Sequence, residues 1–391
     1  MKRSTERILV SHAGVLPRPP EIQELLAAGT SNTEVLNARL PGAVSEIVRH
    51  QVEVGIDVVN DGEYSKRGGF SGYVRDRFSG IESRPRDDGT ARQRGNIAAR
   101  DSKEFPGYYS MPGRVFGTAG APRAQPGQGN QPAACTGPLN YIGQAAVQQD
   151  IANLKAALAG QTVEGYLPAI APGTIEHWLQ NEYYASDEEF LFAIADVMHG
   201  EYKAITDAGL ILQIDDPDLP DGWQMFPDMS VADYRKYADL RVAAINRALA
   251  GIPESQVRLH ICWGSPKGPH KNDIPLKDIV DIVLKVKAEC FSIEAANPRH
   301  DHEWELWQDT KLPAGKSFMP GVIAHITDHV EHPELVAQRL IRYASVMGRE
   351  NVIAGTDCGI GTRVANAEIC WAKLEAMVEG AGIASRKLWG R

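Results

Sequence analysis

The sequence contains no apolar run of the length that a membrane-spanning helix requires, which is about 18 residues. It also lacks a basic excess, because 41 lysines and arginines are outnumbered by 50 aspartates and glutamates, for a net charge of −9. An acidic chain without a long basic run is a poor candidate for a nucleic-acid-binding protein. The first residues carry charges but no apolar segment follows them, as a secretory signal would need. We therefore expect a soluble cytoplasmic protein with no membrane or nucleic-acid partner.

Cysteine is scarce as well, with five residues in a chain of 391. An odd, sparse set in a protein expected to be cytoplasmic argues against a disulfide framework and leaves metal binding or thiol chemistry open. Hydrophobic residues make up 43% and charged residues 23%, which are ordinary globular proportions and exclude disorder or a fibrous architecture. Three cysteines lack any chemical context and are expected to be structural: Cys135, Cys290 and Cys370.

Short runs rich in β-branched residues recur along the chain, and most are followed by a helical pattern. Several runs are continuously apolar, as expected of strands covered on both faces. A capping box at Ser186 and Glu189 starts one of the intervening helices. Eight strands alternating with helices predict an α/β fold, a (β/α)8 TIM barrel, with residues 1–391 as a single catalytic domain. The expected strands are Ile8–Ser11, Ile56–Asn60, Val163–Ile170, Leu210–Ile214, Arg258–Cys262, Cys290–Glu294, Ser317–Ile323 and Asn351–Thr356.

Residues 65–145 interrupt this alternation between the second and third expected strands. The segment has little periodicity, and a connection of this length is unusual inside a compact domain. We interpret it as an insertion that acts as a lid or as an interface, through which the barrel would form a homo-oligomer; a mobile surface insertion is the alternative. Trp178 and Tyr183 follow the third strand and would line a pocket for a flat or apolar ligand, or pack under the insertion.

Four potential metal ligands stand at the ends of three expected strands. His260 and Cys262 end the fifth strand, Glu294 ends the sixth, and Cys358 follows the eighth. In a barrel these strand ends converge on one pocket, and residues two apart on a strand point to the same side. One imidazole, two thiols and one carboxylate suit tetrahedral zinc, because sulfur ligands favour Zn²⁺ over Mg²⁺ or Ca²⁺. The alternative is that both cysteines are buried for packing alone.

Acidic and histidine side chains also follow expected strands. Glu63 comes after the second strand and Asp215 closes the fourth, where carboxylates can bind a substrate ammonium group or exchange protons. For acidic residues at such places, capping of the next helix is the alternative. His325 and His329 lie just past the seventh strand, and each is either a general acid near neutral pH or a surface bystander.

Eight short motifs along the chain resemble those of one known family, the cobalamin-independent methionine synthase superfamily, and in particular its short members with a single barrel. The combination of His-x-Cys, Glu and Asp-Cys-Gly elements is the most specific part of the resemblance. It implies a zinc-dependent transferase that activates a thiol as a zinc thiolate and methylates it. The acceptor would be homocysteine or a related thiol, and the donor a folate of the 5-methyltetrahydrofolate type. The motifs are His12–Pro19, Asn60–Glu63, Pro172–Thr174, Gln213–Pro217, His260–Cys262, Ile293–Glu294, Gly321–Ile323 and Asp357–Gly359.

The resemblance also implies roles for individual residues. Glu63 and Asp215 match the carboxylates that hold the amino group of homocysteine. His12, in the first motif, is a further substrate-binding candidate. The family's zinc ligands match His260, Cys262, Glu294 and Cys358.

Two positions depart from the family pattern. A serine that helps to hold the amino acid is replaced by Val15, whose side chain neither donates nor accepts a hydrogen bond. The family's proton-donating histidine matches His325 with an offset of one residue. Because epoxyalkane:coenzyme M transferase belongs to the same superfamily and alkylates a different thiol, an epoxide:thiol alkyltransferase or another thioether-forming or thioether-cleaving enzyme is the alternative. A zinc hydrolase and a structural zinc protein without turnover are the remaining alternatives.

Overall fold

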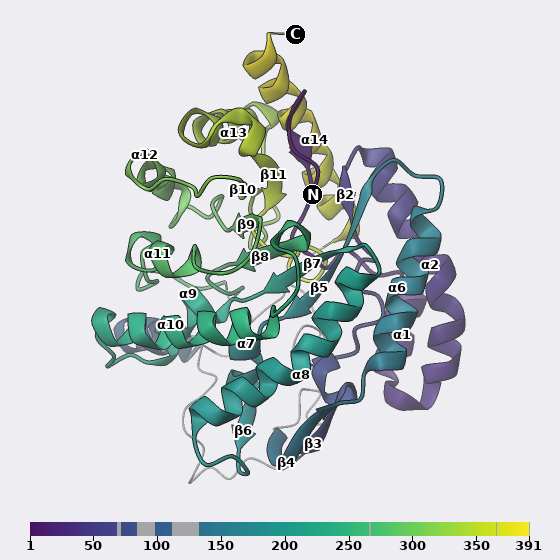
Figure 1. Cartoon of the computed structure of the whole chain (residues 1–391). Helices are drawn as coiled ribbons and strands as arrows, with labels where there is room; N and C mark the ends of the chain where they lie inside the picture. The colour runs from purple at the N-terminus through teal and green to yellow at the C-terminus, as the bar shows by residue number, and fades with distance from the viewer. Residues whose placement is uncertain (69–71, 84–97, 112–132, 266, 365, 391) are drawn as a thin grey trace.

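Eight parallel strands form the centre of the molecule (Figure 1). The computed structural model describes the chain except for residues 69–71, 84–97, 112–132, 266, 365 and 391. The strands pair in the order β1-β11-β10-β9-β8-β7-β5-β2. From β2 to β11, strands of this sheet that follow one another along the chain therefore lie side by side, and β11 also pairs with β1. All eight predicted strands are confirmed: β1 (Leu9–Val10), β2 (Val58–Val59), β5 (Glu164–Ile170), β7 (Ile211–Asp215), β8 (Val257–Ile261), β9 (Cys290–Ile293), β10 (Ser317–Ile323) and β11 (Ile353–Thr356).

The two ends of this sheet meet through a small set of contacts between β1 and β2. The backbone N–H of Asp57 donates to the carbonyl of Val10 at 2.9 Å. The carboxylate of Asp57 accepts from the N–H of Val10 at 2.9 Å, and Ser11 Oγ donates to the carbonyl of Val58 at 2.9 Å. These bonds complete the ring, and the predicted TIM barrel is confirmed.

Helices surround the barrel, and their ends follow local sequence signals. The predicted capping box is present, because Ser186 Oγ accepts from the N–H of Glu189 at 3.1 Å at the start of α8. A search of the described helices finds none that combines the length and apolar character needed to cross a bilayer. The α-helices are α1 (Pro20–Ala27), α2 (Thr33–Val54), α4 (Ala99–Glu104), α5 (Pro106–Tyr109), α6 (Gln144–Leu158), α7 (Pro172–Trp178), α8 (Asp187–Asp207), α9 (Asp218–Met225), α10 (Val231–Ala248), α11 (Val280–Val283), α12 (Leu306–Asp309), α13 (Pro333–Met347) and α14 (Ala367–Trp389). Short 3-10 helices are η1 (Gly29–Asn32), η2 (Tyr73–Asp76), η3 (Glu254–Gln256), η4 (Leu276–Asp278), η5 (Asp301–Glu305) and η6 (Arg349–Asn351).

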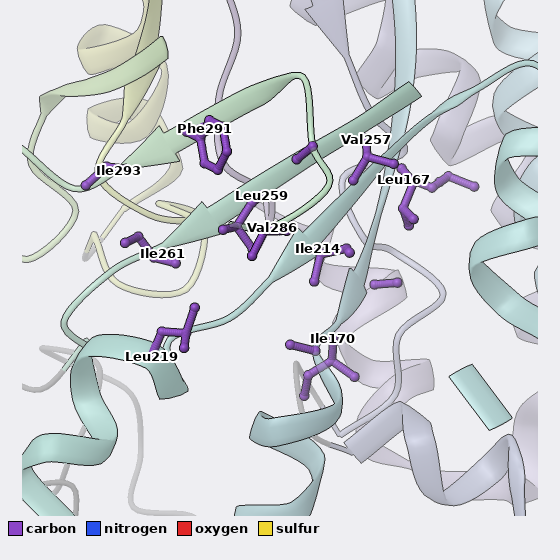
Figure 2. Packing of buried hydrophobic residues seen from close by; sticks show 14 of the residues in the cluster. Leu167, Ile170, Ile214, Leu219, Val257, Leu259, Ile261, Val286, Phe291 and Ile293 are labelled. Atoms are coloured by element: carbon purple, nitrogen blue, oxygen red, sulfur yellow. The ribbon is translucent and has the colours of Figure 1, made fainter. Parts of the chain in front are cut away.

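The largest hydrophobic core lies between the strands and the helices around them. On β8, Val257, Leu259 and Ile261 belong to this core, as Figure 2 shows together with residues of β7 and β9. The intervening residues of β8, Arg258 and His260, face the other way, because side chains alternate along a strand. The alternation therefore sends apolar residues outward to the helices and polar residues into the barrel.

The interior of the barrel has its own small apolar clusters. One is formed by Leu9, Cys290, Met319 and Ile353, and another by Val58, Tyr166 and Ile211. Cys290 is fully buried there, as expected of a structural cysteine. These side chains fill the part of the barrel beneath the polar residues at the strand ends.

The insertion predicted over 65–145 contains regular structure where it is described. Strand β3 (Phe78–Ser83) pairs antiparallel with β4 (Ala133–Tyr141), and β4 pairs parallel with β6 (Leu179–Asn181), which follows α7. Cys135 lies on β4 and is fully buried. This separate three-stranded sheet replaces the featureless connection that the sequence pattern predicts. Its role as a lid or interface stays a prediction.

Candidate metal centre

Three of the four predicted metal ligands come together at the carboxyl ends of the strands. One ligand atom each from His260, Cys262 and Cys358 lies within 4.8 Å of the other two. His260 is the fourth residue of β8 and Cys262 directly follows that strand, while Cys358 lies two residues past β11. The two sulfur atoms are 3.7 Å apart, so the cysteines are free thiols and not a disulfide. We call these three residues the sulfur cluster.

The imidazole of His260 is oriented for a ligand that the protein itself does not supply. Its Nδ1 lies 3.0 Å from Ser292 Oγ on β9, and a proton donated there leaves the lone pair on Nε2. Nε2 is buried and has no hydrogen-bonding partner within the described part of the chain. Buried polar atoms are rarely left unpaired, and metal-bound histidines usually use their second nitrogen in this way. The cluster therefore fits a metal ion by its donor types and by its unpaired atom.

The two thiols of the sulfur cluster affect each other's ionisation. A hydrogen bond from the Cys262 thiol, together with the nearby imidazole of His260, holds the pKa of Cys358 well below its usual range. The bond to Cys358 and burial raise the pKa of Cys262. These shifts favour ionisation of Cys358 and retention of the proton on Cys262, which donates to it. A bound cation would favour the thiolate form of both.

Glu294, the fourth predicted ligand, groups with a different pair of residues. Its carboxylate lies within 4.8 Å of ligand atoms of His325 and Asp357. It accepts hydrogen bonds from the N–H of Trp263 at 2.8 Å and from Asn297 Nδ2 at 3.0 Å. Because Trp263 directly follows Cys262, this carboxylate lies beside the sulfur cluster although it is not part of it. We call Glu294, His325 and Asp357 the acid–histidine cluster.

The acid–histidine cluster also contains unpaired buried atoms. His325 is completely buried, and neither ring nitrogen has a partner among the described residues. Asp357 Oδ1 accepts from the N–H groups of Ala295 and Ala296 at 2.8 and 2.7 Å, but Oδ2 has no described partner. Burial raises the pKa of Asp357 to about 8 and lowers that of His325. The cluster therefore holds a neutral imidazole and a carboxyl group that keeps its proton near neutral pH.

The two predicted acidic residues lie next to these clusters. Asp215 ends β7 and accepts from Gln213 Nε2 at 2.6 Å. Burial raises the pKa of Asp215 to about 7, His260 acts to lower it, and Glu63 raises it further. Glu63 is 6% exposed and its Oε2 lies 3.6 Å from Lys66 Nζ. Glu63, Asp215 and the sulfur cluster are therefore close enough to act on one ligand.

A tight turn presents Glu63 to the site. Asp61 Oδ1 accepts from the N–H of Glu63 at 2.9 Å, and Glu63 itself has a positive φ of 59°, which is uncommon outside glycine. A Cβ atom added at Gly14 would lie 2.6 Å from Glu63 Oε1, so only glycine fits at that position. Gly14, in the motif His12–Pro19, thus leaves space for the carboxylate of Glu63, in the motif Asn60–Glu63.

Comparison with known proteins identifies the family of the chain. The family described as "Cobalamin-independent synthase, Catalytic domain" matches residues 133–383, which is well over half of the chain. The chain belongs to this family. The resemblance inferred from the motifs is confirmed by this match.

The individual relatives have low sequence identity to this chain. A protein of Thermococcus kodakarensis named methionine synthase is 29% identical over 223 residues, which span 57% of this chain and 58% of that protein. A protein of Sulfolobus acidocaldarius with the same name is 26% identical over 381 residues, or 96% of this chain and 91% of that protein. A B12-independent methionine synthase from Shewanella sp. W3-18-1, solved with selenomethionine, has a TM-score of 0.74 at 21% identity and covers 98% of this chain and 100% of its own. The structural likeness supports the barrel fold.

The remaining predicted site residues of this family member lie in different surroundings. His12 is 1% exposed, and its ring nitrogens contact Gln51 Oε1 at 2.8 Å and the Tyr166 hydroxyl at 3.1 Å, while burial lowers its pKa to about 4. Its protein partners indicate a supporting role inside the barrel. Trp178 and Tyr183 are 44% and 52% exposed, and His329 is exposed on the loop after β10. The structure brings none of these four into the two clusters.

Sequence reasoning did not single out Asp357 as a site residue, although it belongs to the Asp-Cys-Gly motif. Its signal is its position directly before Cys358, at a strand end of the barrel. Val15, the departure from the family pattern, lies against the same loop, because a Cβ atom at Gly359 would be 2.6 Å from Val15 Cγ1. A change at position 15 therefore alters the wall next to the sulfur cluster.

Proposed function

We propose that this protein binds Zn²⁺ and methylates a thiol, in the manner of a methionine synthase. The observation that carries the proposal is the sulfur cluster, with its unpaired His260 Nε2 at the strand ends of a cobalamin-independent synthase fold. The names of the relatives support the reaction class, since they are called methionine synthases. We take homocysteine as the acceptor and a folate of the 5-methyltetrahydrofolate type as the donor.

The donor set supports zinc as the metal. One imidazole nitrogen and two sulfurs are ligands that zinc prefers, and the neighbouring carboxylate of Glu294 supplies a fourth. Zinc bound there would lower the pKa of a coordinated thiol so that it ionises near neutral pH. Cys262, Cys358 and Glu294 contribute three negative charges against the two positive charges of zinc. Such an anionic ligand set makes zinc a weak electrophile and leaves a coordinated sulfur nucleophilic. Hydrolysis requires a more electrophilic zinc.

Glu63 and Asp215 would hold the acceptor through its ammonium group. Both carboxylates are buried, with 6% and 5% of their surface exposed, and both lie beside the sulfur cluster. A buried carboxylate pairs strongly with a cationic group that reaches it, because little water competes. The thiol of an amino acid bound in this way would point toward the sulfur cluster.

His325 would supply the proton that the leaving group of the methyl donor needs. A poor leaving group such as a pterin nitrogen requires protonation as the methyl group departs. His325 is buried with both ring nitrogens unpaired among the described residues, and burial raises the pKa of the neighbouring Asp357 to about 8, so that its carboxyl group keeps its proton near neutral pH. These two residues can therefore pass a proton to a donor bound over the site.

Zinc K-edge X-ray absorption on metal-quantified protein, without and with small thiols, tests the proposal. We expect one zinc with about two sulfur ligands, rising to three when homocysteine is added. A rise with coenzyme M and not with homocysteine would favour the epoxide:thiol alkyltransferase, to which Val15 lends support. A sulfur count that no thiol changes would indicate a structural site or a hydrolase and contradict thiol activation.

Matched cysteine variants provide the control. Cys358→Ser removes one ligand and should lower zinc affinity by at least about a hundredfold, since even supporting residues of a metal site contribute 10- to 100-fold. Cys135→Ala removes a buried cysteine of β4, in the separate sheet, and should leave zinc stoichiometry unchanged. Equal zinc content in wild type and Cys358→Ser would contradict the assignment of the site.

A further inference from the structure

A buried arginine lies inside the barrel directly beneath the sulfur cluster. Arg258 precedes His260 by two residues on β8, so both side chains point into the barrel. It is 2% exposed, and its guanidinium lies 4.1 Å from the centre of the Tyr166 ring. Such a position is unusual, because charged residues are rarely buried unless they are paired.

The hydrogen-bonding partners of Arg258 are all neutral. Its Nε donates to Gln213 Oε1 at 2.7 Å, and its two terminal nitrogens donate to Ser11 Oγ at 2.9 Å and to the carbonyl of His12 at 3.2 Å. Within the described residues, no carboxylate lies within 4.0 Å of the guanidinium. Its charge is instead stabilised by these neutral acceptors and by the face of the Tyr166 ring.

Gln213 connects this arginine to the acidic site. Because its Oε1 accepts from Arg258, its Nε2 must face the opposite way, where it donates to Asp215 Oδ1 at 2.6 Å and to the carbonyl of Ala13 at 2.9 Å. The amide therefore has a single orientation. This orientation commits Oδ1 of Asp215 to Gln213 and leaves Oδ2 outside that hydrogen bond.

We infer that Arg258 and Gln213 are positioning residues that make the site selective for thiols carrying an ammonium group. Arg258 fixes the amide of Gln213, and Gln213 fixes the carboxylate of Asp215 at the angle and depth that an ammonium group needs. The inference rests on the proposed function, in which Asp215 holds the acceptor. It adds two residues that act through Asp215 and that the proposed function does not use.

A purely structural role for the two residues predicts a different result. If Arg258 and Gln213 only fill the barrel, their replacement weakens every ligand of the site to the same extent. If they position Asp215, replacement weakens a thiol with an amino group and spares the same thiol without one. Selectivity therefore separates the two roles, whereas affinity for one thiol does not.

The test compares homocysteine with 4-mercaptobutanoate, which has the same thiol and carboxylate but no amino group. Binding of each thiol to zinc-loaded protein is measured by titration calorimetry. In wild type we expect homocysteine to bind more tightly. In Gln213→Met and Arg258→Met we expect homocysteine to bind about 10- to 100-fold more weakly, as for the loss of hydrogen bonds to a charged group, with 4-mercaptobutanoate within about twofold of wild type.

Two further variants make the test specific. Arg258→Lys keeps the charge and one donor, and should restore part of the selectivity lost in Arg258→Met. Arg77→Met removes another buried arginine, whose partners Asp150 and Glu201 lie on α6 and α8, and should leave the selectivity unchanged. Gln213→Met keeps the guanidinium and its other partners, so it carries the test if Arg258→Met does not fold.

Each contrary outcome has a separate meaning. Equal weakening of both thiols in the variants would overturn the positioning role while thiol binding stands. Equal binding of both thiols to wild type would overturn the selectivity for an ammonium group. Failure of wild type to bind either thiol would overturn the proposed function and this inference with it.

Discussion

Two groups of buried, charged side chains follow the strand ends, and they differ in how completely they are paired. In the first, made of Glu176, His177, Asp218 and Arg241, the partners are all within the protein. Arg241 contacts Asp218 and Glu176 at 2.8 Å each, and His177 Nε2 lies 2.7 Å from Asp218 Oδ1. We call this group the paired cluster.

The sulfur cluster and the acid–histidine cluster are also buried, apart from the partly exposed Cys358, but they leave His260 Nε2, Asp357 Oδ2 and both nitrogens of His325 unpaired among the described residues. Burial without pairing is costly, and a fold retains it where a ligand supplies the missing partner. The difference teaches that burial and charge alone do not mark a functional site. What distinguishes the two clusters is that several unpaired atoms gather on metal-ligating side chains, because single unpaired atoms such as Ser317 Oγ also occur elsewhere.

The largest effect expected from this comparison concerns His325. His325→Asn should lower kcat for methyl transfer to homocysteine by about 10²- to 10⁴-fold, the range typical of a lost general acid, while zinc content stays at the wild-type level. His329→Asn is the matched control, because His329 is exposed and its backbone carbonyl, not its ring, accepts from Lys373. Equal losses in both variants would argue against a specific role for His325.

Breaking the paired cluster should instead affect stability. Arg241→Met leaves the carboxylates of Asp218 and Glu176 without their cation and should lower the free energy of unfolding by about 3–5 kcal/mol, measured by urea denaturation. Zinc stoichiometry should not change. Arg247→Met on the same helix removes an exposed arginine paired with Asp196 and should cost less than about 1 kcal/mol. Loss of zinc in Arg241→Met would show that the two groups are coupled.

A smaller effect is expected from the residue that orients His260. Ser292→Ala removes the partner of Nδ1 and should weaken zinc binding by about 10- to 100-fold in a chelator competition assay. Ser317→Ala is the control, since Ser317 is equally buried on β10 but its hydroxyl has no described partner. Identical zinc affinities for wild type, Ser292→Ala and Ser317→Ala would mean that Ser292 does not orient the imidazole of His260.

The smallest effect, counted per pH unit, is on the pH dependence of stability. Burial and the neighbouring Asp218 raise the pKa of Asp216 to about 8, far above its unfolded value of about 4. Between these values the folded state keeps a proton that the unfolded state has lost, so this group makes the protein less stable as the pH rises. Asp216→Asn should therefore gain stability over wild type with increasing pH, by at most about 1.4 kcal/mol per pH unit, in urea denaturation from pH 4 to 8. Curves of unfolding free energy against pH that run parallel for wild type and Asp216→Asn would contradict this prediction.

The main strands could be predicted because their signals are local. β10 is a short, mostly apolar run, β8 alternates apolar and polar residues, and α8 is preceded by Ser186, which caps it. The three-stranded sheet could not be predicted in this way. Strand β4 contains Gly137 and Pro138, both unfavourable in strands, and it forms through pairing with β3 and β6. Pairing of distant segments overrides the weak local preference.

The site could be predicted as far as strand ends determine it. The strand-end rule brings His260, Cys262 and Cys358 together because β8 and β11, although not adjacent, direct their carboxyl ends to the same end of one barrel. It does not indicate that Glu294 groups with His325 and Asp357, because that depends on hydrogen bonds from Trp263 and Asn297. Arg258 had a signal that was passed over, namely a single charge inside an apolar strand on the same face as His260.

The closing of the barrel has a consequence for assembly of the metal site. Cys358 reaches the sulfur cluster only when β11 has docked between β10 and β1, and β1 comes from the opposite end of the chain. A nascent chain that has folded as far as β9 holds His260 and Cys262 but has nothing to complete the set. If zinc binds at the sulfur cluster as proposed, its capture waits for the last strand, and the zinc content of a preparation would report the fraction of molecules in which the first and last strands are joined.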